Sequence, residues 1–128
     1  MRLRAALIAI AMTATASASQ AAECMRANED GEIAEGSLAQ WTFEDAAGRP
    51  EQAFIVTLAV PTCLAGVDET DNVAKATSIH IYSSDASITG SIKELVGTDV
   101  QVRGSAFGAH TAHHHAPIVM DISEIDAH

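Results

Sequence analysis

Residues 77–103 read TSIHIYSSDASITGSIKELVGTDVQVR, and this stretch decides the fold that the sequence predicts. Its first seven residues alternate between apolar and polar. Ile79 and Ile81 fall on one face, which is typical of a half-buried strand. His80 and Tyr82 fall on the opposite face. A strand over 77–83 with an inward isoleucine row is therefore expected.

The pattern then changes to helical spacing. Ile88, Ile92 and Leu95 recur three or four residues apart from Ser87 onward, and Gly97 stands where a helix commonly ends. Val100 and Val102 afterwards return to alternation. The stretch thus predicts a strand, a short helix and a second strand.

Two predicted strands precede this unit, and one follows it. The first covers Glu32–Phe43, with Gly36 as a bulge. The second covers Gln52–Val60 and ends at Pro61. Phe54, Val56, Leu58 and Val60 of this strand face one way, and Ile55, Thr57 and Ala59 face the other. The first strand alternates imperfectly, since Leu38 falls on the face opposite to that of Ile33, Glu35, Ser37, Ala39, Trp41 and Phe43. The last strand is expected to have Ile118, Met120 and Ile122 inward, with Val119, Asp121 and Ser123 outward. The acidic segment Ala65–Ala76 is expected to be a surface loop.

A helix between the third and fourth of five strands is the element order of the OB-fold, a small Greek-key barrel. We therefore predict a mainly β, five-stranded OB-fold-like barrel with one short helix between strands 3 and 4. A β-sandwich is the alternative, although the chain offers few strands for two full sheets.

The N-terminus resembles a secretory signal peptide. Arg2 and Arg4 precede a short apolar segment, and small residues at Ala18 and Ala21 offer two cleavage positions. We expect residues 1–21 to be the signal peptide and 22–128 to form a single domain. A buried N-terminal helix is the alternative. The predicted location is periplasmic or secreted, with no membrane span after signal removal, because no second apolar segment approaches the about 20 residues that a bilayer requires.

The charge balance argues against nucleic acid as a partner. The formal net charge is −10 and becomes −12 without Arg2 and Arg4. The remaining cations are scattered, whereas nucleic-acid binding depends on clustered Lys and Arg that neutralise phosphates. The remaining cations are Arg26, Arg49, Lys75, Lys93 and Arg103.

The chain has two cysteines, Cys24 and Cys63. In an oxidising compartment such a pair usually closes, so we predict a disulfide between them with a structural role. The chain-entropy model values a loop of this length at about 3 to 4 kcal/mol.

Four of the six histidines lie within six positions, His110, His113, His114 and His115, in a turn between the last two predicted strands. Neutral imidazoles bind zinc or copper. Alternation places His113 and His115 on one side, so the expected trio of metal ligands is His110, His113 and His115. A further ligand would come from another loop, from His80 or from water. Two other interpretations stay open, a solvated or pH-responsive turn and a turn braced by ring stacking and hydrogen bonds.

Three segments resemble an uncharacterised exported bacterial family, the domain of unknown function numbered 4431: Leu58–Cys63, Leu95–Gly104 and, most specifically, the histidine-bearing run Gly104–Met120. Gly108 is a departure, since members of that family often carry a bulkier residue there. The resemblance implies a small β domain and no established activity.

These observations predict an exported binding module of unknown ligand, with the histidine turn on its binding face. Trp41, Tyr82 and His80 are candidate ligand-binding residues, because exposed rings can stack on a sugar or peptide. Alternatively, the domain is a purely structural or interaction module. Catalysis is the weakest hypothesis, because the sequence has no Gly-x-Ser-x-Gly or His-Glu-x-x-His motif and no unpaired cysteine for a nucleophile.

Overall fold

The computed structural model describes residues 9–11 and 23–128. The predicted signal peptide, residues 1–21, lies outside this described part except for residues 9–11. None of the described helices has the length and apolar character needed to cross a bilayer.

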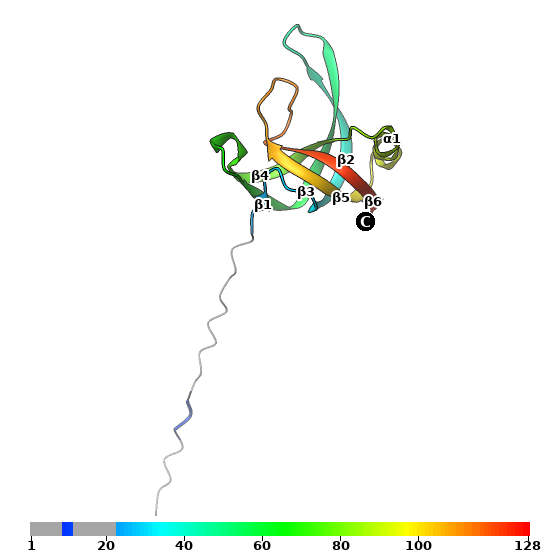
Figure 1. Ribbon diagram of the computed structural model, residues 1–128. Coiled ribbons are helices and arrows are strands. Elements are labelled where there is room, and N and C mark those ends of the chain that lie inside the picture. The colour runs from blue at the N-terminus through cyan, green and yellow to red at the C-terminus, as the bar shows by residue number, and fades with distance from the viewer. Residues whose placement is uncertain (1–8, 12–22) are drawn as a thin grey trace, which may run out of the picture.

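The chain forms one closed β-barrel with a short helix at one end (Figure 1). The strands are ordered β1-β3-β2-β5-β6-β4, and a pairing of β3 with β4 closes the circle. Among the five long strands, α1 lies between the third and fourth, so the predicted OB-fold-like barrel is confirmed. The elements are β1 (Met25–Arg26), β2 (Glu32–Glu44), β3 (Pro50–Ala65), the 3-10 helix η1 (Glu69–Asp71), β4 (Val73–Tyr82), α1 (Ala86–Leu95), β5 (Asp99–Gly108) and β6 (Ile118–Ala127).

The stretch 77–103 folds as its pattern predicts. Ile79 and Ile81 of β4 are fully buried, and β4 pairs in parallel with β6, for example Ile79 with Ile118. Asp85 caps the N-terminus of α1 by accepting a hydrogen bond from the Ser87 backbone N–H at 2.8 Å. Gly97 follows the helix with φ +89°, a conformation that favours glycine.

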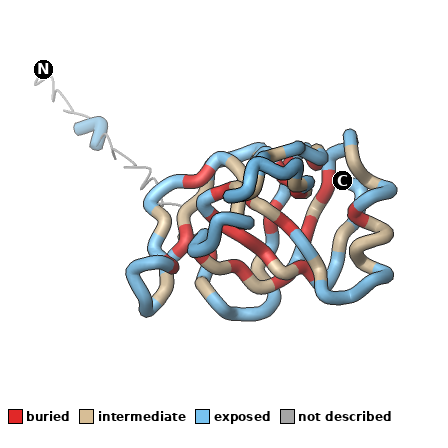
Figure 2. Tube along the Cα trace, turned by 90° about the horizontal axis from the view of Figure 1, so that it is seen from above, coloured by how far each residue is buried: buried red, intermediate tan, exposed pale blue. Residues whose placement is uncertain are grey.

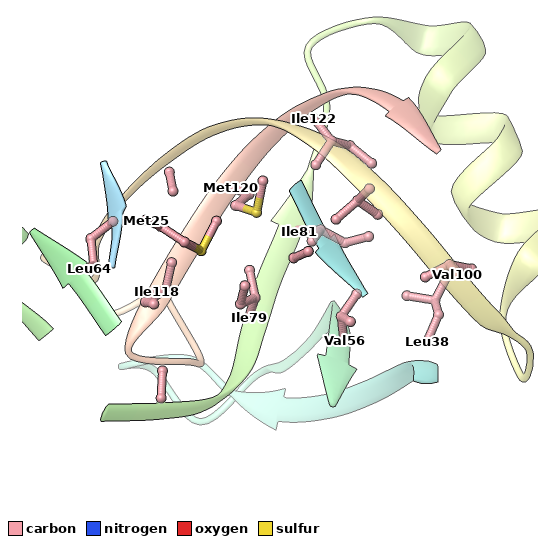
Figure 3. Packing of buried hydrophobic residues seen from close by; sticks show 14 of the residues in the cluster. Met25, Leu38, Val56, Leu64, Ile79, Ile81, Val100, Ile118, Met120 and Ile122 are labelled. Carbon is pink, nitrogen blue, oxygen red and sulfur yellow. The ribbon is translucent and has the colours of Figure 1, made fainter. Parts of the chain in front are cut away.

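The barrel interior is filled by aliphatic side chains from all five long strands (Figure 3). The inward rows predicted for β4 and β6 are confirmed, and the alternating Val100 and Val102 of β5 are both fully buried. Burying one such side chain contributes about 1.5 to 3 kcal/mol. The largest fully buried residues are Leu38, Val56, Ile79, Ile81, Ile92, Val100, Val102, Ile118, Val119, Met120 and Ile122.

The buried face of β2 is the one that carries Leu38, and not the one that carries Ile33 and Trp41. Ala34 and Leu38 are buried, whereas Ile33 is 44% exposed and Trp41 is 54% exposed. Gly36 forms no bulge in either ladder; a Cβ there would lie 2.0 Å from the Thr57 carbonyl oxygen. Glycine is therefore required where β2 passes from pairing with β5 to pairing with β3.

The predicted end of β3 at Pro61 is also wrong, because the strand continues to Ala65. The register between β3 and β4 shifts between Thr57 and Thr62. Pro61 lies in this unpaired stretch, where its missing N–H costs no ladder hydrogen bond. Val60 shares the parity of the fully buried Val56, yet it is 72% exposed.

The predicted disulfide between Cys24 and Cys63 is present, with an S–S distance of 2.05 Å. It joins the segment before β1 to β3 at the point where Met25 pairs in parallel with Leu64. The bond therefore fastens the first ordered residues to the barrel wall.

The barrel also buries residues on part of its outer face. Ala53 and Ile55 of β3 pack with Ala116 and Phe43 in a second, smaller cluster. Val119 of β6, predicted to point outward, does so and is nevertheless fully buried. Figure 2 shows buried segments along the strands and exposed ones in most loops. The outer cluster includes Ala116 of the histidine-bearing loop, so that loop covers part of the wall.

Candidate functional site

The loop 109–117 joins β5 to β6 and is held by its own backbone. The Ala109 N–H donates to the Pro117 carbonyl at 3.1 Å, and the His114 N–H donates to the Thr111 carbonyl at the same distance. These bonds close the base of the loop and form a turn within it. The loop thereby presents its histidines to the outer faces of β3 and β4.

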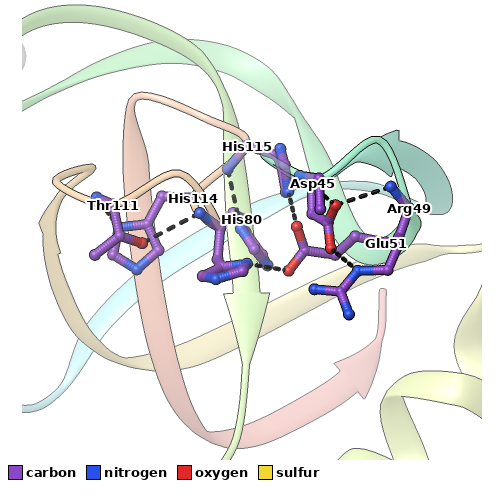
Figure 4. Close-up of polar contacts among 9 residues, drawn as sticks. Asp45, Arg49, Glu51, His80, Thr111, His114 and His115 are labelled. Atoms are coloured by element: carbon purple, nitrogen blue, oxygen red, sulfur yellow. Dashed lines mark hydrogen bonds and ion pairs between the residues drawn. The ribbon is translucent and has the colours of Figure 1, made fainter.

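Glu51, at the start of β3, is the residue on which two of these histidines converge (Figure 4). The His113 Nδ1–H donates to Glu51 Oε1 at 2.5 Å, and the His115 Nε2–H donates to Oε2 at 3.0 Å. An ionised carboxylate only accepts hydrogen bonds, which fixes the donating nitrogen of each ring. One carboxylate thus binds two imidazoles that are remote from it in sequence.

His115 is the more firmly placed of the two. Its ring stacks on Phe43 with centroids 4.0 Å apart, and only 10% of its side chain is exposed. Its backbone N–H donates to Nδ1 of His80, on the outward face of β4, at 3.2 Å. Side chains from β2, β3 and β4 therefore hold this one histidine against the barrel.

The surroundings favour the ionised form of Glu51. Hydrogen bonding from His115 is the main cause that holds the pKa of Glu51 below its ordinary value. Partial burial opposes this effect, and the hydrogen bond from His113 adds to it. The carboxylate consequently carries its negative charge at neutral pH.

The hairpin loop that precedes Glu51 is itself ordered. Asp45 accepts hydrogen bonds from the backbone N–H groups of Ala47 and Arg49 and from Arg49 Nε. The backbone bond from Arg49 is the largest cause of its lowered pKa. The β2–β3 hairpin therefore presents Glu51 from a defined turn.

His80 and His114 remain neutral more readily than an ordinary histidine. Burial is the main cause of the lowered pKa of both, and neighbouring imidazoles add to it. Nδ1 of His80 accepts a hydrogen bond, so the proton of the neutral ring is on Nε2. Nδ1 of His80 therefore holds the loop in place by this hydrogen bond, and the same nitrogen is not free to bind a metal ion while the bond is present.

His114 acts as a brace within the loop. Its Nδ1 accepts from the backbone N–H of His110 at 3.1 Å and of Thr111 at 3.3 Å. The ring of His110 lies 4.8 Å from that of His114, and both lie 5.5 Å from Phe107. His110 and His114 therefore form a separate pair beside the Glu51 contacts.

The structure divides the expected trio of ligands. His113 and His115 meet on Glu51, as alternation predicts, whereas His110 packs against His114. Within residues 9–11 and 23–128, no three His, Cys, Asp or Glu side chains are already positioned to hold a metal ion. The sequence analysis did not identify Glu51 as a site residue. Glu51 lies on the same face of β3 as Ala53 and Ile55, and this shared face is the one signal in the sequence that could have pointed to it.

Two of the three candidate ligand-binding residues, Trp41 and Tyr82, lie apart from this contact, whereas His80 accepts the hydrogen bond from the His115 backbone N–H. The ring of Tyr82 meets Phe107 edge-on at 6.4 Å, and Trp41 is exposed on β2 opposite Ala53. In the described chain no ring contact joins Trp41 to Tyr82. Their role in binding a ligand stays a prediction.

Comparison with known proteins adds a family without an assigned activity. Residues 78–126 match the family model described as "Domain of unknown function (DUF4431)". The matched segment runs from β4 through α1 and β5 to β6 and includes the histidine-bearing loop. No curated protein matches the chain.

Proposed function

We propose that this chain, whose residues 78–126 match the DUF4431 family model, is an exported binding domain that holds a transition-metal ion, zinc or copper, at Glu51, His113 and His115. The observation that carries the proposal is the convergence of two loop imidazoles on the two oxygens of one β3 carboxylate. The domain binds the ion and does not turn over a substrate.

The donor atoms suit such an ion. Zinc takes imidazole nitrogen and carboxylate oxygen at about 2.0 to 2.2 Å, which places two ligand atoms of a tetrahedral site about 3.3 Å apart. The two nitrogen–oxygen distances to Glu51 are 2.5 and 3.0 Å. Each pair is therefore within about 1 Å of ligand spacing. Binding requires each donating nitrogen to give up its proton, to the other ring nitrogen or to water.

Electrostatics also favour a cation at this position. The hydrogen bonds from His115 and His113 keep Glu51 ionised, and the chain as a whole has a formal net charge of −10. A negative surface raises the local concentration of cations. The third ligand proposed here is accordingly Glu51 rather than His110, whose ring is engaged with His114 and Phe107.

The position on the fold supports a binding role. OB-folds use the loop between their first two strands and the loop between their last two strands to border the binding face. In this barrel those loops are residues 45–49 and 109–117, and Glu51 with its two histidines is where they meet. Export is supported by the disulfide and by the predicted signal peptide.

The proposal is tested by titrating zinc into tag-free protein by calorimetry, with copper in a second series. Glu51→Gln, His113→Ala and His115→Ala are each expected to weaken binding at least about tenfold, because an ion held by three donors loses one. His128→Ala is the matched control, since His128 contacts Glu35 and not Glu51.

Two results contradict the proposal: wild-type protein that takes up neither ion at micromolar concentration, and equal affinity in the control and the three site variants. A loss of affinity in His110→Ala as large as in His113→Ala would instead favour the trio of histidines. Circular dichroism of each variant checks that the barrel is intact.

A second candidate is a structural role for the same histidines, and the contacts of His114 favour it. Its Nδ1 accepts two backbone N–H groups, which orders the loop without any ion. If this were the whole function, His114→Ala would lower stability equally with and without zinc, and no variant would change zinc uptake.

A further inference from the structure

A groove opens on the barrel wall away from the histidine-bearing loop, where β2 and β3 separate. Their ladder begins at the pair Gly36–Leu58, and Glu32–Glu35 of β2 pair only with β5. The space between the two strands is about 290 Å³. It is lined by Met25, Ile33, Ala34, Glu35, Leu58, Ala59, Val60, Pro61 and Thr62.

The backbone of β2 presents unpaired polar groups to this groove. The Leu38 N–H donates to the Thr98 carbonyl, and the Leu38 carbonyl accepts from the Gly97 N–H, so the polar groups of Leu38 point toward β5. Those of successive residues in a strand alternate between its two edges. The N–H and C=O of Ile33 and Glu35 therefore point toward β3, which within the described chain offers them no ladder partner.

The opposite wall of the groove cannot supply the missing bonds. Ala59, Val60 and Pro61 have no ladder partner in β2 or β4, and Pro61 has no N–H. Val60 is 72% exposed and Ile33 is 44% exposed. The groove thus combines an open strand edge with apolar side chains on both walls.

The rim of the groove is acidic. Glu35 lines it directly, and an adjoining hollow is lined by Glu23 and Glu32. Among the described residues that line these two hollows, Arg26 is the one Lys or Arg, and it is bound to Glu29 at 2.8 Å and to Glu32 at 2.9 Å. Glu35 accepts a hydrogen bond from Gln101 Nε2 at 2.8 Å and lies 3.3 Å from His128 Nε2. Carboxylates therefore outnumber cations around the open edge.

We propose that this edge binds an extended, cationic segment of a partner protein by strand addition. The segment pairs its backbone with Ile33 and Glu35, places alternate apolar side chains against Ile33 and Val60, and directs its lysine or arginine side chains to the acidic rim. Strand addition derives affinity from main-chain hydrogen bonds and specificity from alternate side chains. A second copy of this chain is disfavoured, because two acidic rims would then face each other.

The test uses the full mature chain and a seven-residue peptide of alternating lysine and valine with blocked termini. Amide hydrogen exchange followed by NMR is expected to show fast exchange at Ile33 and Glu35 in the free protein, in contrast to Ala34. Saturating peptide is expected to slow exchange at Ile33 and Glu35 at least about tenfold, as a newly paired edge requires.

Matched peptides and variants isolate the contacts. A peptide with N-methylated alternate amides keeps the charge and loses the backbone donors, and a glutamate–valine peptide reverses the charge; both are expected to bind at least about tenfold more weakly. Val60→Lys is expected to weaken binding, whereas Val67→Lys, the same change at an exposed residue outside the groove, leaves it unchanged.

Three results overturn the proposal. One is slow exchange at Ile33 and Glu35 in dilute protein without peptide, which would mean that the edge is already covered. Another is protection that rises with protein concentration alone, which would assign the edge to a second copy. The last is equal affinity for the N-methylated and unmodified peptides, which would leave only charge attraction.

Discussion

Gly108 and Thr70 approach so closely that a Cβ on Gly108 would lie 1.6 Å from the Thr70 carbonyl oxygen. The same glycine donates its N–H to Asp71 Oδ1 at 2.9 Å, and the other oxygen of Asp71 accepts from Asn28 Nδ2 at 3.0 Å. The segment expected to be a plain surface loop is therefore packed against the start of the histidine-bearing loop, with Asp71 only 8% exposed.

Gly108→Ala is expected to lower the free energy of unfolding by about 1 to 3 kcal/mol, because the backbone of Thr70 must move to admit a methyl group. Gly90→Ala is the matched control. Nothing lies within 4 Å of a Cβ at this helical position, so stability should rise by about 0.5 to 1 kcal/mol. Urea denaturation measures both; equal effects of the two substitutions would refute the close approach.

Loss of the disulfide should destabilise the barrel through the unfolded state. The bond spans a sequence separation of 39, for which chain entropy gives about 3 to 4 kcal/mol. The double variant Cys24→Ser/Cys63→Ser is expected to lose that much in urea denaturation. Wild-type protein unfolded under reducing conditions should match it. A loss below about 1 kcal/mol would show that the bond contributes little beyond the packing of β1 on β3.

The cap of α1 predicts a dependence of stability on pH. Hydrogen bonds from Ser87 hold the pKa of Asp85 below its ordinary value. Since the pKa is lower in the folded than in the unfolded chain, the charged cap stabilises the fold above the unfolded value of about 3.9 and loses this effect as pH falls through the folded pKa.

Asp85→Ala should accordingly be less stable than wild type at pH 7, and the difference should shrink below about pH 4. Asp85→Asn keeps an oxygen that can accept the hydrogen bond but has no titrating carboxyl group. The stability of this variant should therefore not include the pH dependence that Asp85 contributes to wild type. Thermal unfolding from pH 3 to 7 measures all three proteins. A difference between wild type and Asp85→Ala that is constant with pH would contradict the charged cap.

The fold could be predicted from the sequence where a strand has one buried face and keeps it. Ile79 with Ile81 and Val100 with Val102 alternate cleanly because each of these strands packs one face on the barrel interior. The short helix was evident from its spacing and from Gly97. Together these elements are enough to place the helix between the third and fourth long strands.

Alternation does not identify the buried face where a residue's environment depends on segments remote in sequence. Ile33 and Trp41 follow the parity that looked apolar, yet β2 is shared between β5 and β3, and its interior side is set by Ala34 and Leu38. Ile55 is buried on the outer face because the histidine-bearing loop covers it through Ala116. The alternation of apolar and polar residues in β3 does not indicate that a remote loop packs on its outer face.

The sequence predicts only the part of the site that depends on local alternation. The pairing of His113 with His115 on one side follows from local alternation. Their common partner Glu51 lies 62 residues before His113, and only the closure of the barrel brings the two loops together. The separation of His110 depends on packing against Phe107 and His114, which the sequence pattern does not specify.

The most direct test of the proposed metal site is a long-range ¹H–¹⁵N NMR spectrum of the imidazoles in tag-free protein, recorded with and without one equivalent of zinc. We expect the resonances of His113 Nδ1 and His115 Nε2 to shift together, while those of His128 stay in place. Six histidines that are unchanged by zinc, or that all shift alike, would contradict the assignment of the site to Glu51, His113 and His115.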